Sequence, residues 1–338
     1  MRILHIDRGI DFRGGQKQLL ELHKGLLANN IESVILCQKG APLYNLKIDQ
    51  VPLISGIEFR VLQIINYIRE SNPHIIHFHE AKSLNLLLFK NLKGYKTVET
   101  RRVSYPVSFL SRKLKYRKID VHIAVSCGIY EYLKQYYKNV ALIESCLVLD
   151  GLQSDGESPY RKKFNLLFIG ALSSQKGIFT LLNAYNLLKS EEVALNIVGD
   201  GMLKKKIIKF IKNNRLGNSV FLYNFTDSPG RFYKYADVVV VPSISGEGSS
   251  GVIKEALYFN KIVIVSDIEP NRKIIAHNEN GIIFKSQNVS DLHKKLQSVL
   301  KGEITINASC IKDSLQRFDC KTLVSKHIGL YRGLLNER

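Results

Sequence analysis

The fold of this chain is decided by residues 238–267, VVVVPSISGEGSSGVIKEALYFNKIVIVSD. The apolar run Val238–Val241 is followed by a Gly/Ser loop that carries Glu247. Glu255 comes eight positions later on a helical stretch, and a second apolar run follows at residues 262–265. The pattern predicts strand, loop, helix and strand, which is the repeating unit of a parallel α/β sheet.

The loop in this segment is suited to binding an anion. In open α/β sheets, ligands bind at the carboxyl ends of the strands, where the first N–H groups of the next helix are free. Small residues let a diphosphate approach the backbone here: Gly248, Ser249, Ser250 and Gly251. Because carboxylates repel phosphate, Glu247 and Glu255 are expected to accept hydrogen bonds from hydroxyls, as an acid does with ribose. A nucleotide diphosphate sugar carries both kinds of group.

These residues, with Pro242 and Ser243 before them, resemble retaining glycosyltransferases of family 4, which have the GT-B fold. The resemblance extends in order over residues 164–300 and includes FIGAL at 168–172, QKG at 175–177, IVGDG at 197–201 and NGIIF at 280–284. Nearer the start, ILHI at residues 3–6 and RGG at residues 13–15 resemble the glycine loop of the acceptor domain.

The resemblance implies a role for individual residues. Glu247 would contact hydroxyls of the donor sugar, Glu255 the ribose hydroxyls, and Lys176 the diphosphate. The implied donor site also includes the loop residues Gly248, Ser249, Ser250 and Gly251, the glycines Gly14, Gly15 and Gly170, and, near the base, Asn224 and Phe225.

The sequence departs from the family at residue 171, where an Arg is usual and this chain has Ala171. A second cation for the diphosphate then has to come from Arg13, Arg101 or Arg102, or is absent. The same three arginines are expected on the acceptor side of the site. The usual Asn-Gly-Val-Asp turn near the domain hinge is also replaced, by VLDG at residues 148–151.

Two histidines flank Phe78 at the end of an expected strand. Alternation along the strand places His77 and His79 on one face, where either could line the ligand site or act as a base, with an ordinary structural role as the alternative. An HxH pair supplies only two metal ligands, Glu80 points to the other face, and no DxD pattern occurs. We therefore expect no metal, and charge stabilisation by Lys176, backbone N–H groups and a helix N-terminus.

The chain is strongly basic, with 49 Lys and Arg against 30 Asp and Glu and a formal net charge of +19. This predicts attraction to a polyanion, either nucleic acid or an anionic membrane. Residues 101–118, RRVSYPVSFLSRKLKYRK, hold seven basic residues and no acid. Interleaved aromatic and aliphatic residues favour a segment at an anionic lipid surface, with a solvated basic face as the alternative. The lysine-rich residues 204–215 are expected to form a helix whose apolar face packs on the core.

Apolar strands alternate with amphipathic helices along the chain, which predicts two parallel sheets. The first has expected strands at residues 3–7, 33–37, 74–78, 97–99, 121–125 and 140–143, with helices at 16–28 and 59–70; the second has strands at 165–169, 194–198, 220–223, 238–241, 262–265 and 282–284. A polar break at residues 150–163 separates the sheets. We predict two Rossmann-like domains facing across a cleft: an acceptor-binding domain at residues 1–155 and a nucleotide-sugar-binding domain at 156–318. Residues 319–338 would carry a last helix, 321–335, back to the first domain.

No apolar run is long enough to cross a bilayer, and the start MRILHID lacks the apolar core of a secretory signal. Widely spaced cysteines without a CxxC pair are expected to be buried, reduced thiols: Cys37, Cys127, Cys146, Cys310 and Cys320. Both observations favour a cytoplasmic protein.

These features predict a hexosyltransferase at the inner face of the cytoplasmic membrane. It would move a hexose from a nucleotide diphosphate sugar, expected to be UDP-linked, to a lipid-linked or lipopolysaccharide-type glycan, with retention and without cofactor. The alternatives are a non-hydrolysing nucleotide-sugar epimerase on the same fold and a basic nucleic-acid-binding protein; no nucleic-acid partner is expected. The donor base and sugar, the acceptor linkage and the oligomeric state stay open.

Overall fold

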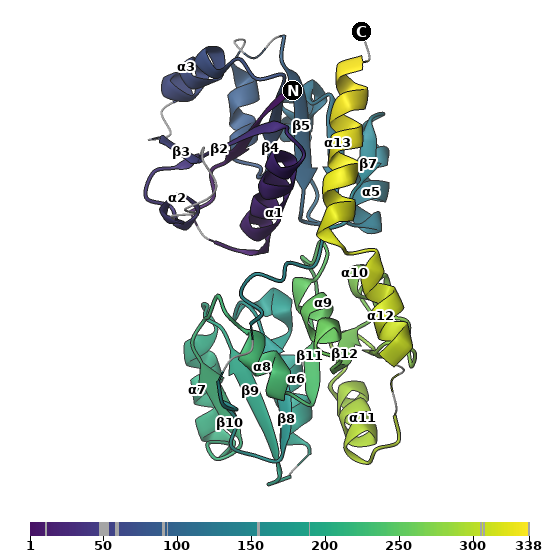
Figure 1. Cartoon of the computed structure of the whole chain (residues 1–338). Helices are drawn as coiled ribbons and strands as arrows, with labels where there is room; N and C mark the ends of the chain where they lie inside the picture. Colours follow the sequence, from purple (N-terminus) through teal and green to yellow (C-terminus); the bar gives the residue numbers. More distant parts are fainter. Residues whose placement is uncertain are drawn as a thin grey trace. The chain divides into compact units, whose positions relative to one another are not determined.

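The computed structural model describes residues 1–10, 12–46, 54–57, 61–89, 92, 94–153, 156–188, 190–304, 306 and 308–336. The chain forms two compact units (Figure 1). Unit 1 comprises Met1–Val148 and Phe318–Arg338, and unit 2 comprises Leu149–Arg317. The chain therefore leaves unit 1 just before the polar break at residues 150–163 and returns to it for its last helix.

Unit 1 is built on a seven-stranded parallel sheet in the order β3-β2-β1-β4-β5-β6-β7. Its strands are β1 (Arg2–Asp7), β2 (Glu32–Gln38), β3 (Ile54–Ile57), β4 (Ile75–Phe78), β5 (Lys96–Arg101), β6 (Val121–Ala124) and β7 (Val140–Leu142). The sequence predicted six strands and missed β3, because ISGI is short and half of it is Ser and Gly, which are poor strand formers.

The helical elements of unit 1 are α1 (Gly14–Ala28), α2 (Pro42–Asn45), α3 (Val61–Ser71), η1 (Ser83–Leu88), α4 (Phe109–Leu114), η3 (Tyr116–Lys118), α5 (Cys127–Lys134) and α13 (Cys320–Asn336). The start of the helix expected at residues 59–70 falls on positions 59 and 60, which lie outside the described residues. Helix α1 begins two residues earlier than expected, so Gly14 and Gly15 form its first turn.

Helices α1 and α13 lie side by side on one face of this sheet (Figure 1). Leu22 and Leu26 of α1 share a buried cluster with Leu323 and Val324 of α13. A Cβ at Gly25 would lie 2.2 Å from a methyl of Val324, so the helices approach closely because α1 has no side chain at that point. Each fully buried aliphatic side chain in such a cluster stabilises the fold by about 1.5–3 kcal/mol.

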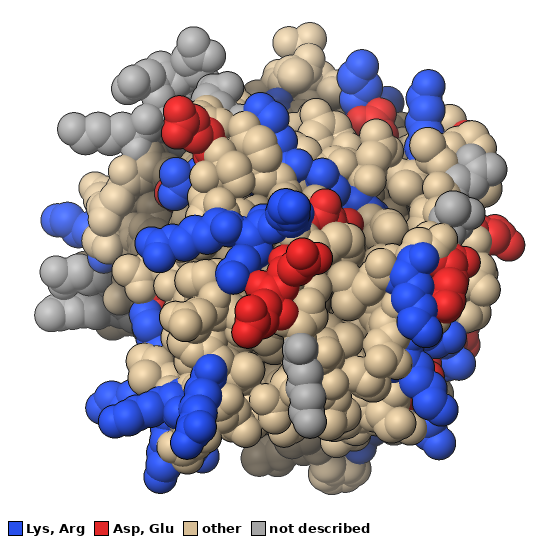
Figure 2. Space-filling model, turned by 90° about the horizontal axis from the view of Figure 1, so that it is seen from below, with Lys and Arg blue, Asp and Glu red and all other residues tan. Residues whose placement is uncertain are grey.

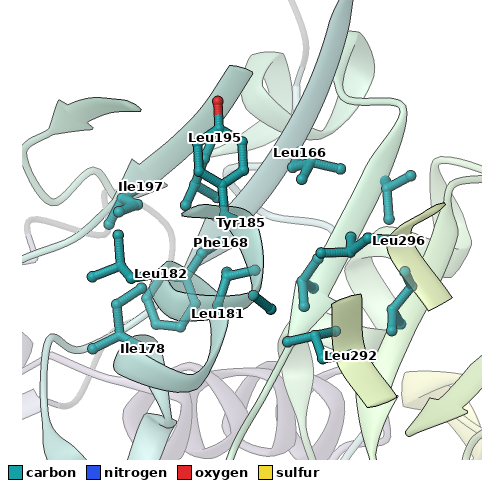
Figure 3. Close-up of a cluster of buried hydrophobic side chains, with 14 of the residues drawn as sticks. Leu166, Phe168, Ile178, Leu181, Leu182, Tyr185, Leu195, Ile197, Leu292 and Leu296 are labelled. Carbon is teal, nitrogen blue, oxygen red and sulfur yellow. The ribbon is translucent and has the colours of Figure 1, made fainter. Parts of the chain in front are cut away.

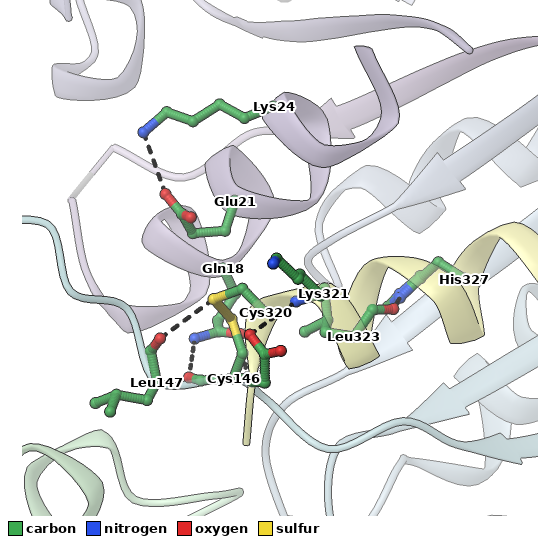
Figure 4. The surroundings of a disulfide bond; sticks show 10 residues. Gln18, Glu21, Lys24, Cys146, Leu147, Cys320, Lys321, Leu323 and His327 are labelled. Carbon is green, nitrogen blue, oxygen red and sulfur yellow. Dashed lines mark hydrogen bonds and ion pairs between the residues drawn. A yellow bond between two sulfur atoms is a disulfide. The ribbon is translucent and has the colours of Figure 1, made fainter. Parts of the chain in front are cut away.

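A disulfide joins Cys146 to Cys320, with a Cα–Cα distance of 4.9 Å and a sequence separation of 174 residues (Figure 4). The expectation that all cysteines are reduced thiols is therefore wrong for this pair. The bond links the segment that leaves unit 1 to the start of α13. The side chain of Gln18 in α1 forms two hydrogen bonds of 2.8 Å with Cys146: its Oε1 accepts from the backbone N–H, and its Nε2 donates to the backbone C=O. Two cysteines so far apart in sequence give no local pairing signal; the fold brings them together.

Unit 2 is built on a six-stranded parallel sheet in the order β10-β9-β8-β11-β12-β13. Its strands are β8 (Phe164–Ile169), β9 (Val193–Val198), β10 (Val220–Tyr223), β11 (Val238–Val241), β12 (Ile262–Ser266) and β13 (Ile282–Phe284). All six were expected. The helical elements are η4 (Ser174–Lys176), α6 (Ile178–Asn186), α7 (Lys204–Asn213), α8 (Gly230–Tyr235), α9 (Gly251–Tyr258), α10 (Glu269–Arg272), α11 (Val289–Leu300) and α12 (Ala308–Gln316).

The core of unit 2 lies between its sheet and the helices α6 and α11 (Figure 3). Leu181 and Leu182 of α6 and Leu292 and Leu296 of α11 are almost completely buried there. Helix α7 adds its apolar face to the same core through Ile207, while its lysines stay at the surface, as the sequence predicted. This packing fixes the sheet whose strand ends carry the candidate site.

Among the described residues, no helix is both long and apolar enough to cross a membrane.

Candidate functional site

The carboxyl ends of β8 and β11 mark the point where the strand order of unit 2 reverses. Ligands bind at such a reversal in open α/β sheets. The loops that follow the two strands are joined, because the Ile244 N–H donates to the Gln175 C=O at 2.7 Å. Gly177 has a φ of +63°, and a Cβ there would lie 1.9 Å from the Pro242 carbonyl oxygen, so only glycine lets the loops approach this closely.

Glu247 is held at this reversal by two hydrogen bonds. Its Oε1 accepts from Lys176 Nζ and from Ser243 Oγ, both at 2.6 Å. The side chain is 7% exposed. Behind it, Ser266 Oγ donates to the Ser243 C=O at 2.5 Å, and Asn271 Nδ2 donates to Ser266 Oγ at 3.1 Å. This buried chain of hydrogen bonds fixes the carboxylate beside the ammonium of Lys176.

Glu255 is held from a different direction. Tyr233 Oη donates to its Oε2 at 2.6 Å, and the Tyr233 ring stacks on Phe259 at 5.7 Å between centroids. Burial, followed by the negative charge of Glu255, raises the pKa of Tyr233 well above its ordinary value, so the phenol remains a donor. A Cβ at Gly251 would lie 3.5 Å from Glu255 Oε1, which places the carboxylate at the N-terminal end of α9, beside the Gly/Ser loop.

The other donor-site candidates of unit 2 follow neighbouring strands at the same edge of the sheet. Gly170 follows β8, and Asn224 and Phe225 follow β10. The Phe225 ring is 63% exposed, while its N–H donates to Asp200 after β9. Ala171 is exposed and carries no charge, so the cation that the family usually has there is missing from this edge.

Unit 1 has a matching reversal between β1 and β4. Arg102, just after β5, lies against Gly15 in the first turn of α1, where a Cβ would be 3.2 Å from Arg102 Cδ. Burial lowers the pKa of Arg102 to about 10, although the neighbouring Asp7 opposes the shift. Asp7 itself has a pKa raised by burial, and it accepts hydrogen bonds from the Gly9 N–H and from Gln16. A cation and a helix N-terminus thus meet at the glycine turn.

The three candidate arginines do not all lie in one place. Arg102 reaches the glycine turn, and Arg13 is the exposed N-cap residue of α1. Arg101 is 5% exposed and lies on the opposite face of β5, where its guanidinium donates to Tyr116 Oη at 3.2 Å and to the Tyr105 C=O. Alternation along a strand explains why adjacent residues point apart. The geometry therefore does not support the expectation that Arg101 and Arg102 bind the acceptor together.

His77 and His79 lie on one face, as expected, and with His5 of β1 they form a buried cluster. His5 Nδ1 lies 2.9 Å from His79 Nε2. Both His77 nitrogens are used, by Tyr331 of α13 and Thr100 of β5, at 2.7 Å each. Burial is the main cause that lowers the pKa of all three well below the ordinary value, so they are neutral at pH 7.

These three histidines could offer metal ligands, since one nitrogen of each lies within 4.8 Å of the others. Neutral imidazoles are suitable ligands. Here, however, hydrogen bonds already occupy both nitrogens of His77, and Arg102 Nη2 lies 3.5 Å from His79 Nδ1. Hydrogen bonds therefore engage His77 and His79 fully, whereas the second nitrogen of His5, Nε2, is buried without a hydrogen-bond partner.

Residues 153–317 match the protein family of glycosyl transferases, group 1. The uncharacterized glycosyltransferase MJ1178 of Methanocaldococcus jannaschii is 27% identical over 242 residues, which cover 69% of this chain and 60% of that protein. A 4-alpha-N-acetylgalactosaminyltransferase of Campylobacter jejuni, whose named substrate is a diphospho-undecaprenol, is 26% identical over 197 residues, or 56% of this chain and 53% of that protein. The chain thus spans little more than half the length of these curated relatives.

The structure of Anabaena HepE with UDP-glucose superposes with a TM-score of 0.84 and 16% identity, covering 98% of this chain and 100% of that one. The fold is therefore that of the GT-B class, as the sequence predicted. The family match at residues 153–317 falls almost entirely within unit 2, Leu149–Arg317, so it is the sequence of this unit that is similar to the glycosyl transferases of group 1.

Sequence reasoning missed several residues at the site. Tyr233 comes 22 positions before Glu255, and its phenol reaches that carboxylate from a different helix, α8. His5 is paired with His77 in the register between β1 and β4. Lys254 stands inside the motif itself, where the helical pattern left it unassigned. A lysine on the buried side of an amphipathic helix was the signal that could have found it.

Proposed function

We propose that this protein transfers a sugar from a nucleotide diphosphate donor to a glycan acceptor. One observation carries the proposal: Glu247 and Glu255 are both fixed by short hydrogen bonds beside a Gly/Ser loop and a helix N-terminus, at the strand reversal of unit 2. Carboxylates in fixed positions recognise hydroxyls, and the loop and helix start recognise phosphate. The match of unit 2 to the model of the glycosyl transferase family supports this proposal.

The donor is proposed to be a UDP-linked hexose. The proposal draws on HepE, which was solved with UDP-glucose, and on the exposed Phe225 ring at the end of β10, which offers a surface for stacking a base. Glu255 would then bind the ribose hydroxyls and Glu247 the hydroxyls of the sugar. Lys176 would approach the diphosphate while remaining paired with Glu247.

The transfer is proposed to proceed with retention, as in family 4, and without a metal or cofactor. No general base is required, because the departing phosphate can take the proton of the acceptor on the same face of the sugar. Charge that develops on the leaving diphosphate would be stabilised by Lys176 and by the N–H groups at the start of α9. His79 is neutral and buried, so its proposed part is to orient Arg102 near the glycine turn rather than to carry a proton.

The acceptor is proposed to be a lipid-linked or lipopolysaccharide-type glycan, met at the inner face of the cytoplasmic membrane. Helix α4 has no buried residue, and its Phe109 and Leu110 are 71% and 64% exposed. Lys113 and Arg117 are exposed in the same segment. Exposed apolar side chains beside cations match an anionic lipid surface, at about 1 kcal/mol per basic residue.

A vesicle experiment tests this membrane role. Two variants would be sedimented with vesicles rich in anionic lipid: one neutralises Arg112, Lys113, Lys115, Arg117 and Lys118, and the other is Phe109→Ser with Leu110→Ser. Both should lose most of the binding, whereas neutralising Lys205 and Lys206 on α7 should not. Unchanged binding by the α4 variants would defeat the proposal.

The overall basic charge has a rival explanation in nucleic-acid binding. On the face drawn in Figure 2, Lys and Arg side chains are spread over the surface with Asp and Glu among them. On this face, a spread of this kind favours general attraction to polyanions over a single nucleic-acid groove. DNA binding that is salt-sensitive, in a protein that binds no nucleotide sugar, would favour the rival.

Product analysis tests the proposed reaction itself. The protein would be incubated with a panel of labelled nucleotide sugars, with and without lipid-linked glycans, and any product examined by NMR for its anomeric configuration. Transfer that needs the acceptor and keeps the configuration supports the proposal. Conversion of the donor alone into its epimer would instead identify the epimerase alternative.

A further inference from the structure

Lys254 is a lysine in the interior of unit 2, with an exposed fraction of 0%. It lies in the first half of α9, and its neighbours on the buried side of that helix are apolar, namely Ile253, Ala256 and Leu257. Removing an ammonium from water is costly even after the protein relaxes, and an apolar side chain of similar volume avoids that cost. The lysine therefore needs a reason to be there.

The direction of the side chain suggests that reason. Long side chains on a helix lean toward its N-terminus, and Lys254 Nζ reaches back to donate to Ser249 Oγ at 2.6 Å. Ser249 belongs to the loop between Glu247 and the first residue of α9, Gly251. The ammonium thus lies beneath the segment that the proposed donor diphosphate would contact.

The charges around this loop call for a second cation. Lys176 is bonded to Glu247, so its positive charge is offset before any ligand arrives. Ala171 supplies none. A diphosphate carries more negative charge than one offset lysine and a helix N-terminus can balance. Lys254 brings its amino group to the α9 side of the loop, at Ser249.

We propose that Lys254 is a positioning residue for the donor diphosphate and acts through Ser249. This inference rests on the proposed function. Because Lys254 Nζ donates to Ser249 Oγ, the hydroxyl must direct its own hydrogen elsewhere, and a phosphate oxygen at the loop can accept it. A hydroxyl that accepts from a cation is polarised and donates more strongly, so the charge reaches the phosphate through the serine.

The test compares a nucleoside diphosphate with its nucleoside. UDP and uridine would be titrated by calorimetry into the wild type, Lys254→Met, Ser249→Ala and the double variant, and the same would be done with GDP and guanosine and with ADP and adenosine. Methionine keeps the volume of the lysine without its charge. Lys209→Met, on the exposed side of α7 in the same unit, is the matched control.

Both single variants should weaken binding of the diphosphate about 10- to 100-fold, as loss of a hydrogen bond to a charged group does. Binding of the nucleoside should not change, because it lacks the phosphates. The double variant should bind the diphosphate as weakly as the single variant with the lower affinity, and no more weakly. The reason is that both substitutions interrupt the same path from Lys254 through Ser249 to the phosphate. Lys209→Met should bind as the wild type does, and Lys254→Met should melt at the same or a higher temperature.

Three results would overturn the inference. The first is that Lys254→Met binds the diphosphate as tightly as the wild type. The second is that its affinity for the nucleoside falls as much as its affinity for the diphosphate, which would indicate damage to the whole pocket. The third is a loss of diphosphate affinity in the double variant equal to the sum of the two single losses in free energy, which would show that the lysine does not act through Ser249. If Lys254→Met does not fold, Ser249→Ala provides the test, and an affinity of this variant for the diphosphate equal to that of the wild type would also overturn the inference. A wild type that binds none of the nucleotides would refute the proposed function itself, which is a separate outcome.

Discussion

Unit 1 should lose stability as the pH falls from 7 to 5, in part through His327 of α13. His327 is 4% exposed, and burial lowers its pKa from an ordinary 6.5 to about 4, although its hydrogen bond to the Leu323 C=O opposes the shift. The groups that face it include His77 and Tyr331, with Arg102 as the nearby cation. None of these groups carries a negative charge that would stabilise the protonated form of His327.

The sign follows from which state binds the proton. The unfolded chain takes it up near pH 6.5, while the folded chain resists until about pH 4, so the stabilisation is complete above 6.5 and is lost as the pH falls toward 4. With these two values, His327 alone removes about 2 kcal/mol between pH 7 and pH 5, and about 3 kcal/mol by pH 4. His5, His77 and His79 are shifted in the same direction and add to the loss.

Urea denaturation followed by circular dichroism at pH 5, 6 and 7 measures this directly. In His327→Gln the dependence of the unfolding free energy on pH should be shallower than in the wild type by about one proton, or about 1.4 kcal/mol per pH unit near pH 5. The slope is the readout, because the substitution itself changes stability at pH 7. His74→Gln, at an exposed position of unit 1, is the control. Equal slopes in wild type and His327→Gln would refute the reasoning.

Three further predictions concern the loops, the disulfide and Glu255. Gly177→Ala should cost about 3 kcal/mol or more in a thermal melt, because its Cβ would overlap the Pro242 oxygen at a positive φ; a change below 1 kcal/mol would contradict the described approach of the loops. Cys146→Ser should lower the stability of unit 1 by about 2–5 kcal/mol and make it insensitive to reductant, whereas equal melts of the untreated proteins would show that the bond contributes nothing. Tyr233→Phe should weaken binding of UDP about fivefold or more by releasing Glu255, and calorimetry that finds unchanged affinity would exclude the positioning role of the phenol.

The arrangement of unit 2 could be predicted in detail from sequence, because each of its strands is a short apolar run between clear breaks. The E-x7-E spacing likewise gave the loop and the helix on which both carboxylates lie. What could not be predicted depends on contacts between distant segments. The pairing of Cys146 with Cys320 and the hydrogen bond from Tyr233 to Glu255 both arise only after the helices pack.

Unit 1 was predicted less completely, for local reasons. Strand β3 has too few β-branched residues to be recognised, and it forms because β2 offers it an edge. Arg101 and Arg102 were assigned to one role, but alternation along a strand separates neighbouring side chains, and the two guanidinium groups lie in different surroundings. The histidine cluster needed the register between β1 and β4, which no single-sequence pattern contains.

The most direct test of the central claim is a thermal-shift panel of the purified protein against UDP, GDP, ADP, CMP and their common sugars. A ligand at 100 times its dissociation constant adds about 2.7 kcal/mol of stability, which such a melt resolves. We predict a shift with one nucleotide family, UDP first, and its loss in Glu255→Ala. No shift with any nucleotide, or the same shift in Glu255→Ala, would contradict the assignment of the donor site.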